Sequence, residues 1–147
     1  MKGNVASLIA NGCLYLLLSS CGSSGENGIQ GIKDLKTRQY AVAGQELYVQ
    51  HCANCHQKDG SGLGQLIPPL KGVGYGENDA SRIAYIIRNG LQGEIVVNEK
   101  TYNQPMPANP QLKPLDIAKI TTYLISKWGE QPTLVTADQV NDYMRNN

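Results

Sequence analysis

The chain has 147 residues, about the size of one domain, and 41% of them are hydrophobic, which is enough for one core and argues against wholesale disorder. Its 13 basic and 12 acidic side chains nearly cancel, so no basic patch for nucleic acid and no acidic run is visible. The 16 glycines and the absence of phenylalanine favour a loop-rich fold with few regular elements.

Residues 1–20 predict a signal peptide. Lys2 precedes a mostly apolar stretch over residues 5–18, which is shorter than the roughly 20 residues that a membrane-spanning helix needs. Cys13 lies inside this stretch and would be removed with it.

The segment Leu18-Ser19-Ser20-Cys21 resembles the bacterial lipoprotein signal box, where small residues precede a cysteine that receives lipid. This resemblance implies a lipid anchor at Cys21, in a bacterial cell envelope, on the periplasmic or outer side of the inner membrane. Gly22 is not the aspartate that retains such proteins there, so a cell with two membranes would carry the chain on the outer one. The alternative is an ordinary signal peptide with an incidental cysteine. Residues 21–39 begin rich in Gly, Ser and Asn and are expected to form a flexible tether.

The folded part is expected over residues 40–129, as an all-α arrangement of three to five helices with long loops and no sheet. Helices are predicted over 40–52, 79–90 and 114–128, with loops over 56–75 and 91–112. In the second helix Asp79 is the expected N-cap, an isoleucine stripe forms the buried face, and Gly90 ends it.

The last predicted helix has apolar side chains at Ile117, Ile120 and Leu124, with Pro114 in its first turn and Gly129 after its end. Val96-Val97 is expected as a short extended segment within a loop. Residues 130–147 are expected to form a C-terminal tail with one weak helical turn over 137–144.

Cys52-Ala53-Asn54-Cys55-His56 is the pattern of c-type haem attachment. Thiols at Cys52 and Cys55 stand one helical turn apart and can add to the two vinyl groups of one porphyrin, and His56 then reaches the iron from the proximal face. Three alternatives compete with this interpretation. A disulfide redox pair would require a thioredoxin-like βαβ unit around the motif, and the sequence does not predict one. A zinc site including His51 would need four ligands from one turn, and a chance match is the third.

The sixth iron ligand is predicted by elimination. The only other histidine, His51, directly precedes the motif, and the same backbone turn cannot carry it to the opposite face of the haem. Met106 follows 50 residues after His56, in a loop between two prolines that stiffen the chain. The alternative for Met106 is to fill a gap in the core. Met144, near the C-terminus, is expected to contribute to packing.

The chain resembles the class I cytochrome c family over about residues 40–129. The resemblance rests on the C-A-N-C-H motif, the I-P-P-L segment at 67–70, the M-P pair at 106–107 and a final I-T-T-Y-L helix that ends in W-G. It implies a cytochrome c fold wrapped around one covalently bound haem c. It also implies that the first and last helices cross, with Gly44 and Tyr48 meeting Ile120 and Tyr123.

The same resemblance implies that the carbonyl of Pro68 accepts a hydrogen bond from the His56 imidazole, with Pro69 as the alternative. Such a bond fixes the tautomer and raises the basicity of the ligand. Four further side chains are candidates for hydrogen bonds to the haem propionates or the methionine sulfur, with ordinary surface or core positions as the alternative: Tyr75, Arg82, Arg88 and Tyr102.

The expected function is that of a one-electron carrier, not an enzyme, with redox proteins of unknown identity as partners, a membrane contact through lipid, and no nucleic acid. A second hypothesis is a haem-bearing relay subunit of a periplasmic dehydrogenase, reductase or terminal oxidase. A third is a haem sensor or peroxidase with an open iron site, against which Met106 argues.

Overall fold

The computed structural model describes residues 28–72 and 79–146. Its helices are α1 (Leu35–His51), α2 (Ala53–His56), α3 (Ala80–Asn89), α4 (Pro114–Trp128) and α5 (Ala137–Asn146). The strands β1 (Ile95–Val97) and β2 (Lys100–Tyr102) form one antiparallel hairpin with Ile95 opposite Tyr102. The described part is mostly helical, which confirms the all-α prediction. Among these residues, no helix combines the length and apolar character that a membrane crossing requires.

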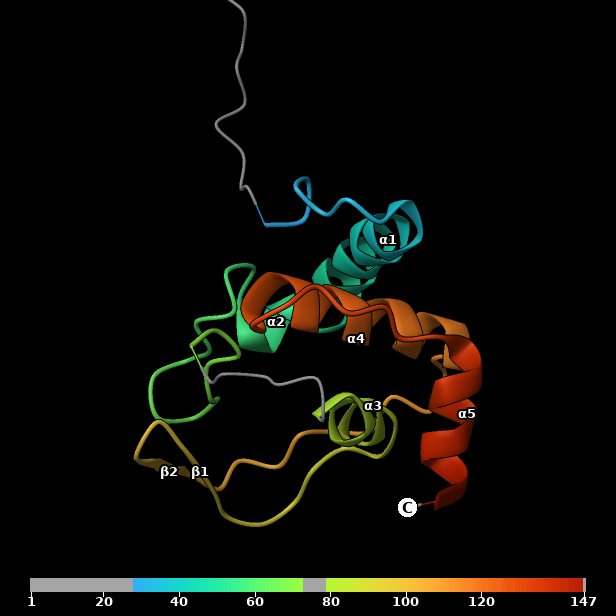
Figure 1. Cartoon of the computed structure of the whole chain (residues 1–147). Coiled ribbons are helices and arrows are strands. Elements are labelled where there is room, and N and C mark those ends of the chain that lie inside the picture. Colours follow the sequence, from blue (N-terminus) through green and yellow to red (C-terminus); the bar gives the residue numbers. More distant parts are fainter. Residues whose placement is uncertain (1–27, 73–78, 147) are drawn as a thin grey trace, which may run out of the picture.

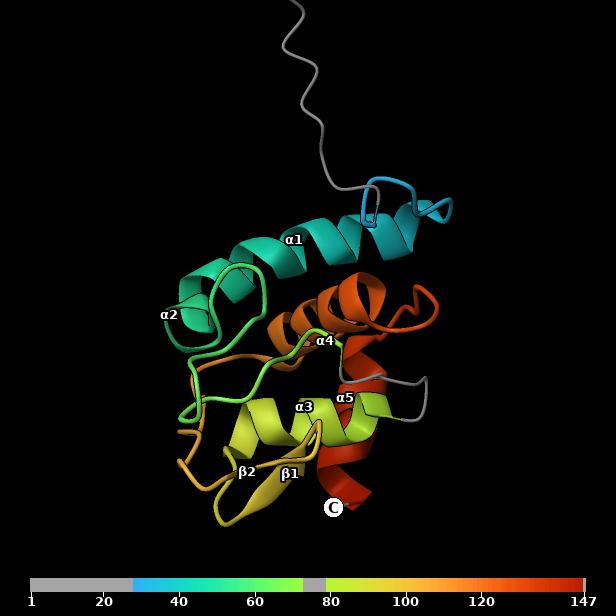
Figure 2. The same cartoon turned by 90° about the vertical axis from the view of Figure 1, so that its left-hand side faces the viewer.

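The crossing of α1 over α4 is the main packing contact, and both views show it (Figures 1 and 2). At Gly44 a side chain would collide with α4, because an added Cβ would lie 2.8 Å from the Cβ of Tyr123. Next to this point the rings of Tyr48 and Tyr123 pack with centroids 5.3 Å apart, and Trp128 lies 5.6 Å from each. The expected meeting of a glycine and an aromatic on the first helix with the last helix is therefore confirmed.

The first helix begins earlier than predicted. It starts at Leu35, where the Asp34 carboxylate accepts hydrogen bonds from the Thr37 backbone N–H at 2.7 Å and from its hydroxyl at 2.6 Å. Ile29 and Ile32 are buried in the core. The predicted tether is therefore wrong for residues 28–39, because two isoleucines three residues apart anchor a segment that its Gly-rich surroundings made look unstructured.

The C-terminal residues also fold onto the domain, so the predicted tail is wrong, although the helical turn predicted over 137–144 lies within α5. Helix α5 packs against α4 and α3, and Val140 on it is fully buried. The connection before α5 is fixed by the buried Thr122 hydroxyl, which accepts from the Val135 N–H at 3.0 Å and donates to the Val135 carbonyl at 3.3 Å. In Figure 1, α5 stands on the opposite side of the molecule from the hairpin.

The hairpin corrects the expectation of no sheet, although the extended segment at Val96-Val97 lies within β1. The two turn residues Asn98 and Glu99 both have positive φ angles, 49° and 63°. Two left-handed residues are what a tight hairpin turn of this length requires, and asparagine tolerates that conformation well. A Gly does not follow the asparagine, so the sequence lacked the strongest hairpin signal.

Candidate haem-binding site

The Cys-x-x-Cys-His motif forms one tight turn directly after α1. The Cys52 carbonyl accepts hydrogen bonds from the N–H of Cys55 at 3.1 Å and of His56 at 2.9 Å. Cys52 is half-buried and Cys55 is exposed, and no disulfide joins them. The turn thus brings the Cys52 thiol and the His56 imidazole to the wall of one cavity, which Cys55 does not line.

The His56 imidazole is buried, and burial lowers its pKa because a charged ring would lose its hydration. The Pro68 carbonyl lies near enough to oppose that lowering in part, but the contact falls short of regular hydrogen-bond geometry, and Nδ1 has no other partner among the described residues. A buried imidazole that stays neutral, with Nδ1 beside the Pro68 carbonyl, keeps its other ring nitrogen, Nε2, for a metal.

Burial, and to a smaller extent the neighbouring Cys55 thiol, raises the pKa of Cys52 to about 11. A reactive redox thiol needs the opposite shift, because the thiolate is the nucleophile. In the described ranges no three His, Cys, Asp or Glu side chains gather as a metal site, so the zinc alternative has no ligand set there. These observations therefore disfavour a disulfide redox pair and a zinc site as alternatives to haem attachment.

A cavity of about 340 Å³ opens beside this turn, and it is lined by Cys52, His56 and, from a distant loop, Met106. Most of the other lining side chains are aliphatic and come from α3, α4, β1 and the segment before β1: Ile83, Ile86, Ile87, Leu91, Ile95, Val97, Ile120 and Leu124. A large apolar cavity with a free imidazole, a thiol and a thioether at its wall fits an apolar macrocycle that holds iron.

Met106 is held at the cavity by a short backbone pairing. Its N–H donates to the Leu91 carbonyl at 2.9 Å, and the Leu91 N–H donates to the Met106 carbonyl at 3.0 Å. The pairing is close because Gly90, with φ of 77°, has no side chain where one would lie 2.5 Å from the Met106 carbonyl oxygen. The predicted ligand therefore lies beside the C-terminal end of α3.

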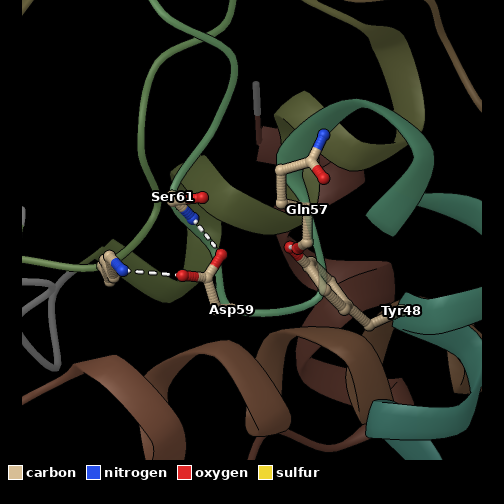
Figure 3. Close-up of polar contacts among 5 residues, drawn as sticks. Tyr48, Gln57, Asp59 and Ser61 are labelled. Atoms are coloured by element: carbon tan, nitrogen blue, oxygen red, sulfur yellow. Dashed lines mark hydrogen bonds and ion pairs between the residues drawn. The ribbon is translucent and has the colours of Figure 1, made fainter.

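The loop over residues 57–71 covers the His56 side of the cavity. Asp59 accepts hydrogen bonds from the Ser61 N–H at 3.0 Å and from the Lys71 ammonium at 2.8 Å (Figure 3). The contact with Lys71 joins the two ends of the loop. The Leu70 N–H adds a bond to the Gly60 carbonyl at 2.8 Å. Pro68 and Pro69 both line the cavity, and the carbonyl beside His56 is that of Pro68.

The four secondary candidates separate clearly. Arg82 is exposed and lines the cavity. Arg88 instead donates to the carbonyls of Pro110 at 2.7 Å and Leu112 at 2.8 Å. Tyr102 is buried on β2, apart from the cavity lining, and Tyr75 lies outside the described residues, as do Cys21 and the predicted signal peptide.

Sequence reasoning missed one polar contact at the site. The Tyr48 hydroxyl donates to the carbonyl of Gln57, the residue after His56, at 2.6 Å. Tyr48 was expected only as a helix-packing aromatic. Its second role depends on a backbone turn at Gln57 that no sequence pattern announces, since glutamine rarely adopts a positive φ.

Comparisons with known proteins identify the family of the chain. The family model for cytochrome c matches residues 41–128. The chain is 34% identical over 91 residues to cytochrome c-552 of Thermus thermophilus, which covers 59% of this chain and 69% of that protein. It is 38% identical over 90 residues to cytochrome c-551 of Bacillus subtilis strain 168, covering 61% of this chain and 78% of that one.

A third relative is the cytochrome c subunit of a quinone alcohol dehydrogenase from Gluconacetobacter polyoxogenes. It is 33% identical over 104 residues, which cover 68% of this chain but only 22% of that subunit. With a family model that spans most of the folded part and a cavity whose walls fit the cofactor, the chain belongs to the cytochrome c family and carries one covalently bound haem c.

Proposed function

We propose that the chain is a one-electron carrier of the cell envelope, with haem joined to Cys52 and Cys55 and its iron held by His56 and Met106. When bound, the haem supplies an iron that takes up and releases one electron. The observation that carries the proposal is the cavity wall that Cys52 and His56 share with Met106, although the two ligands stand 50 residues apart in the chain.

The residues around the cavity favour electron transfer over bond-breaking chemistry. The aliphatic wall excludes water and favours the iron state of lower charge, and a thioether ligand raises the reduction potential further. The half-buried Met106 would occupy the sixth position, which a sensor or peroxidase needs open. His51 is not among the lining residues, so the described wall offers no histidine besides His56 for proton transfer.

The test is the ligation of the ferric holo-protein. We expect a weak near-infrared sulfur-to-iron band in the ferric wild type, which Met106→Ala abolishes, and the reduced variant should bind carbon monoxide at its open iron position. Met144→Ala is the matched control, because Met144 packs against the core away from the cavity lining, and it should keep the band. Persistence of the band in Met106→Ala would refute the assignment of Met106 as a ligand.

Acid–acetone extraction tests the covalent attachment at Cys52 and Cys55. It should leave the haem on the protein, since thioether bonds resist extraction.

Lipid anchoring at Cys21 is the second part of the proposal. Its support is the signal-box resemblance. Gly28, the first residue that the structure describes, follows Cys21 by seven residues, which can span at most about 25 Å. A lipidated chain would therefore hold its haem domain close to the membrane. Cys21→Ser should shift haem-staining protein from the membrane pellet to the soluble extract or stop maturation, whereas Cys13→Ser should not. Wild-type protein that is wholly soluble would overturn the anchor.

A role as electron-relay subunit is the alternative, and the match to a dehydrogenase's cytochrome c subunit favours it. The two roles differ in what accompanies the chain. Gentle solubilisation of the membrane should yield the free cytochrome if it is a mobile carrier, and a stoichiometric complex with a larger redox subunit if it is a relay.

A further inference from the structure

Gln57, directly after the proposed iron ligand His56, has an unusual backbone conformation. Its φ is 62° and its ψ is 157°. This region is nearly restricted to glycine, and a residue with a side chain stays there only when its surroundings hold it. A strained residue next to a ligand therefore calls for a group that maintains it.

Tyr48 is that group, because it holds both ends of the turn that carries the ligand. Its backbone carbonyl accepts from the Cys52 N–H at 2.8 Å, before the turn. Its hydroxyl donates to the Gln57 carbonyl at 2.6 Å, after the turn, where Figure 3 shows the ring reaching toward Gln57. The Gly60 N–H makes a second, longer bond of 3.2 Å to the same carbonyl.

The Tyr48 side chain is rigidly placed. It is 0% exposed and packs against the rings of Tyr123 and Trp128. The imidazole between the two held ends has, by contrast, no regular hydrogen bond at Nδ1 within the described structure. The Pro68 carbonyl meets this nitrogen in a contact short of regular hydrogen-bond geometry, so the backbone of the turn contributes to the direction of His56 beside it.

We propose that Tyr48 is a positioning residue for the iron's proximal ligand: by fixing the Gln57 carbonyl, its hydroxyl sets the orientation of the His56 imidazole in the cavity. The inference rests on the proposed function in taking His56 as the iron ligand. Because ligand orientation alters the electronic state of haem iron, the hydroxyl would tune the reduction potential without touching the metal.

The experiment uses the holo-protein with Tyr48→Phe, which removes one oxygen and keeps the ring. A buried hydrogen bond contributes a two- to tenfold factor to an equilibrium, so the ratio of reduced to oxidised protein at a fixed potential should change by about that factor. The g values of the ferric electron paramagnetic resonance spectrum should change with it. Tyr40→Phe, the same substitution two turns earlier on α1, is the matched control and should change neither.

Gln57→Gly separates positioning from general stability. Glycine adopts the conformation at residue 57 without help, so Tyr48→Phe should have a clearly smaller effect in that background. An equal effect there would show that the hydroxyl acts directly on the cavity that Tyr48 also lines, and would overturn the proposal. An unchanged potential and spectrum in Tyr48→Phe would overturn it as well.

If Tyr48→Phe accumulates little holo-protein, the yield becomes the measurement. Adding Gln57→Gly should restore it, and no restoration counts against the proposal. The ferric spectrum of the wild type is recorded first. If the low-spin spectrum persists in His56→Ala, the assignment of His56 as a ligand is refuted. If the spectrum depends on His56 but Tyr48→Phe changes neither spectrum nor potential, only the positioning role is refuted.

Discussion

The two proposed ligands are held by different kinds of structure. On the His56 side, side chains tie together residues close in sequence: Tyr48 to Gln57, and Asp59 to Ser61 and Lys71. Met106 is held by a backbone pairing with Leu91, so its position depends on a loop docked against the end of α3. The contacts that hold His56 join residues close in sequence, whereas those that hold Met106 depend on long-range packing. We therefore expect perturbations to release Met106 before His56.

The largest effect should come from Gly90→Ala. The new Cβ would lie 2.5 Å from the Met106 carbonyl oxygen and 2.8 Å from the Ala108 nitrogen, at a φ that disfavours a side chain. We expect a loss of about 3 kcal/mol in the free energy of unfolding and disappearance of the sulfur-to-iron band, with the His56 contacts kept.

Gly93→Ala is the matched control for that change, since Gly93 also has a positive φ, 90°, but open space around it. It should cost only about 1 kcal/mol in chemical unfolding and keep the band. Equal effects at the two glycines would mean that the approach of the Met106 loop is not what holds this ligand.

Gly62→Ala tests the His56 side in the same way. Its Cβ would press on the carbonyl of Ile67 and lie 2.7 Å from the Pro68 carbonyl group. The neighbouring Leu63 and Leu66 are exposed, so this loop can yield, and we expect a smaller loss of about 2 kcal/mol. The sulfur-to-iron band should remain while the potential shifts. Gly64→Ala, with nothing within 4 Å, is the control and should leave the potential unchanged.

The two sides also differ in how far the sequence could predict them. The His56 turn lies within five consecutive residues whose spacing predicts its chemistry, and Met106 was predicted as a ligand by elimination and from its flanking prolines. What holds each ligand was less accessible. The Tyr48 contact depends on the positive φ of Gln57, which the sequence does not indicate. The Leu91–Met106 pairing joins two loop segments that show no strand pattern.

The ends of the domain were missed for a related reason. Ile29 and Ile32 are isolated apolar residues among glycines, and Val135 and Val140 lie in a polar segment, so neither pair gives a periodic signal. Each becomes buried only when it joins the hydrophobic core of the folded domain. Tertiary packing, which a single sequence does not display, decided their structure.

A third effect, smaller again, is expected at the loop between the hairpin and α4. The Arg88 guanidinium donates to the carbonyls of Pro110 and Leu112 and so fixes the chain that follows Met106. Arg88→Leu should cost about 1–2 kcal/mol in thermal or chemical unfolding and weaken the sulfur-to-iron band at elevated temperature. Arg38→Leu removes a longer contact of 3.5 Å to the Ile32 carbonyl and should cost less. The reverse ranking would contradict the view that the Met106 side depends on these distant bonds.

The smallest effect should be a pH dependence confined to the His56 side. Hydrogen bonds from Lys71 and Ser61 hold the pKa of the Asp59 carboxyl well below its usual value. A carboxyl with a lowered native pKa contributes its stability in full above the ordinary aspartate pKa, about 4, and loses it as the pH falls through the lower native pKa. Asp59→Asn should therefore flatten the dependence of the unfolding free energy on pH below about pH 4 and change little at neutral pH, because the group is exposed and screened by water.

Asp142→Asn, which breaks an exposed pair with Arg145 on α5, is the control. Urea unfolding between pH 2 and 7, followed by the haem absorption, would measure the difference. If Asp59→Asn shifts the sulfur-to-iron band instead, the two sides of the cavity are coupled more tightly than their separate hydrogen bonds imply.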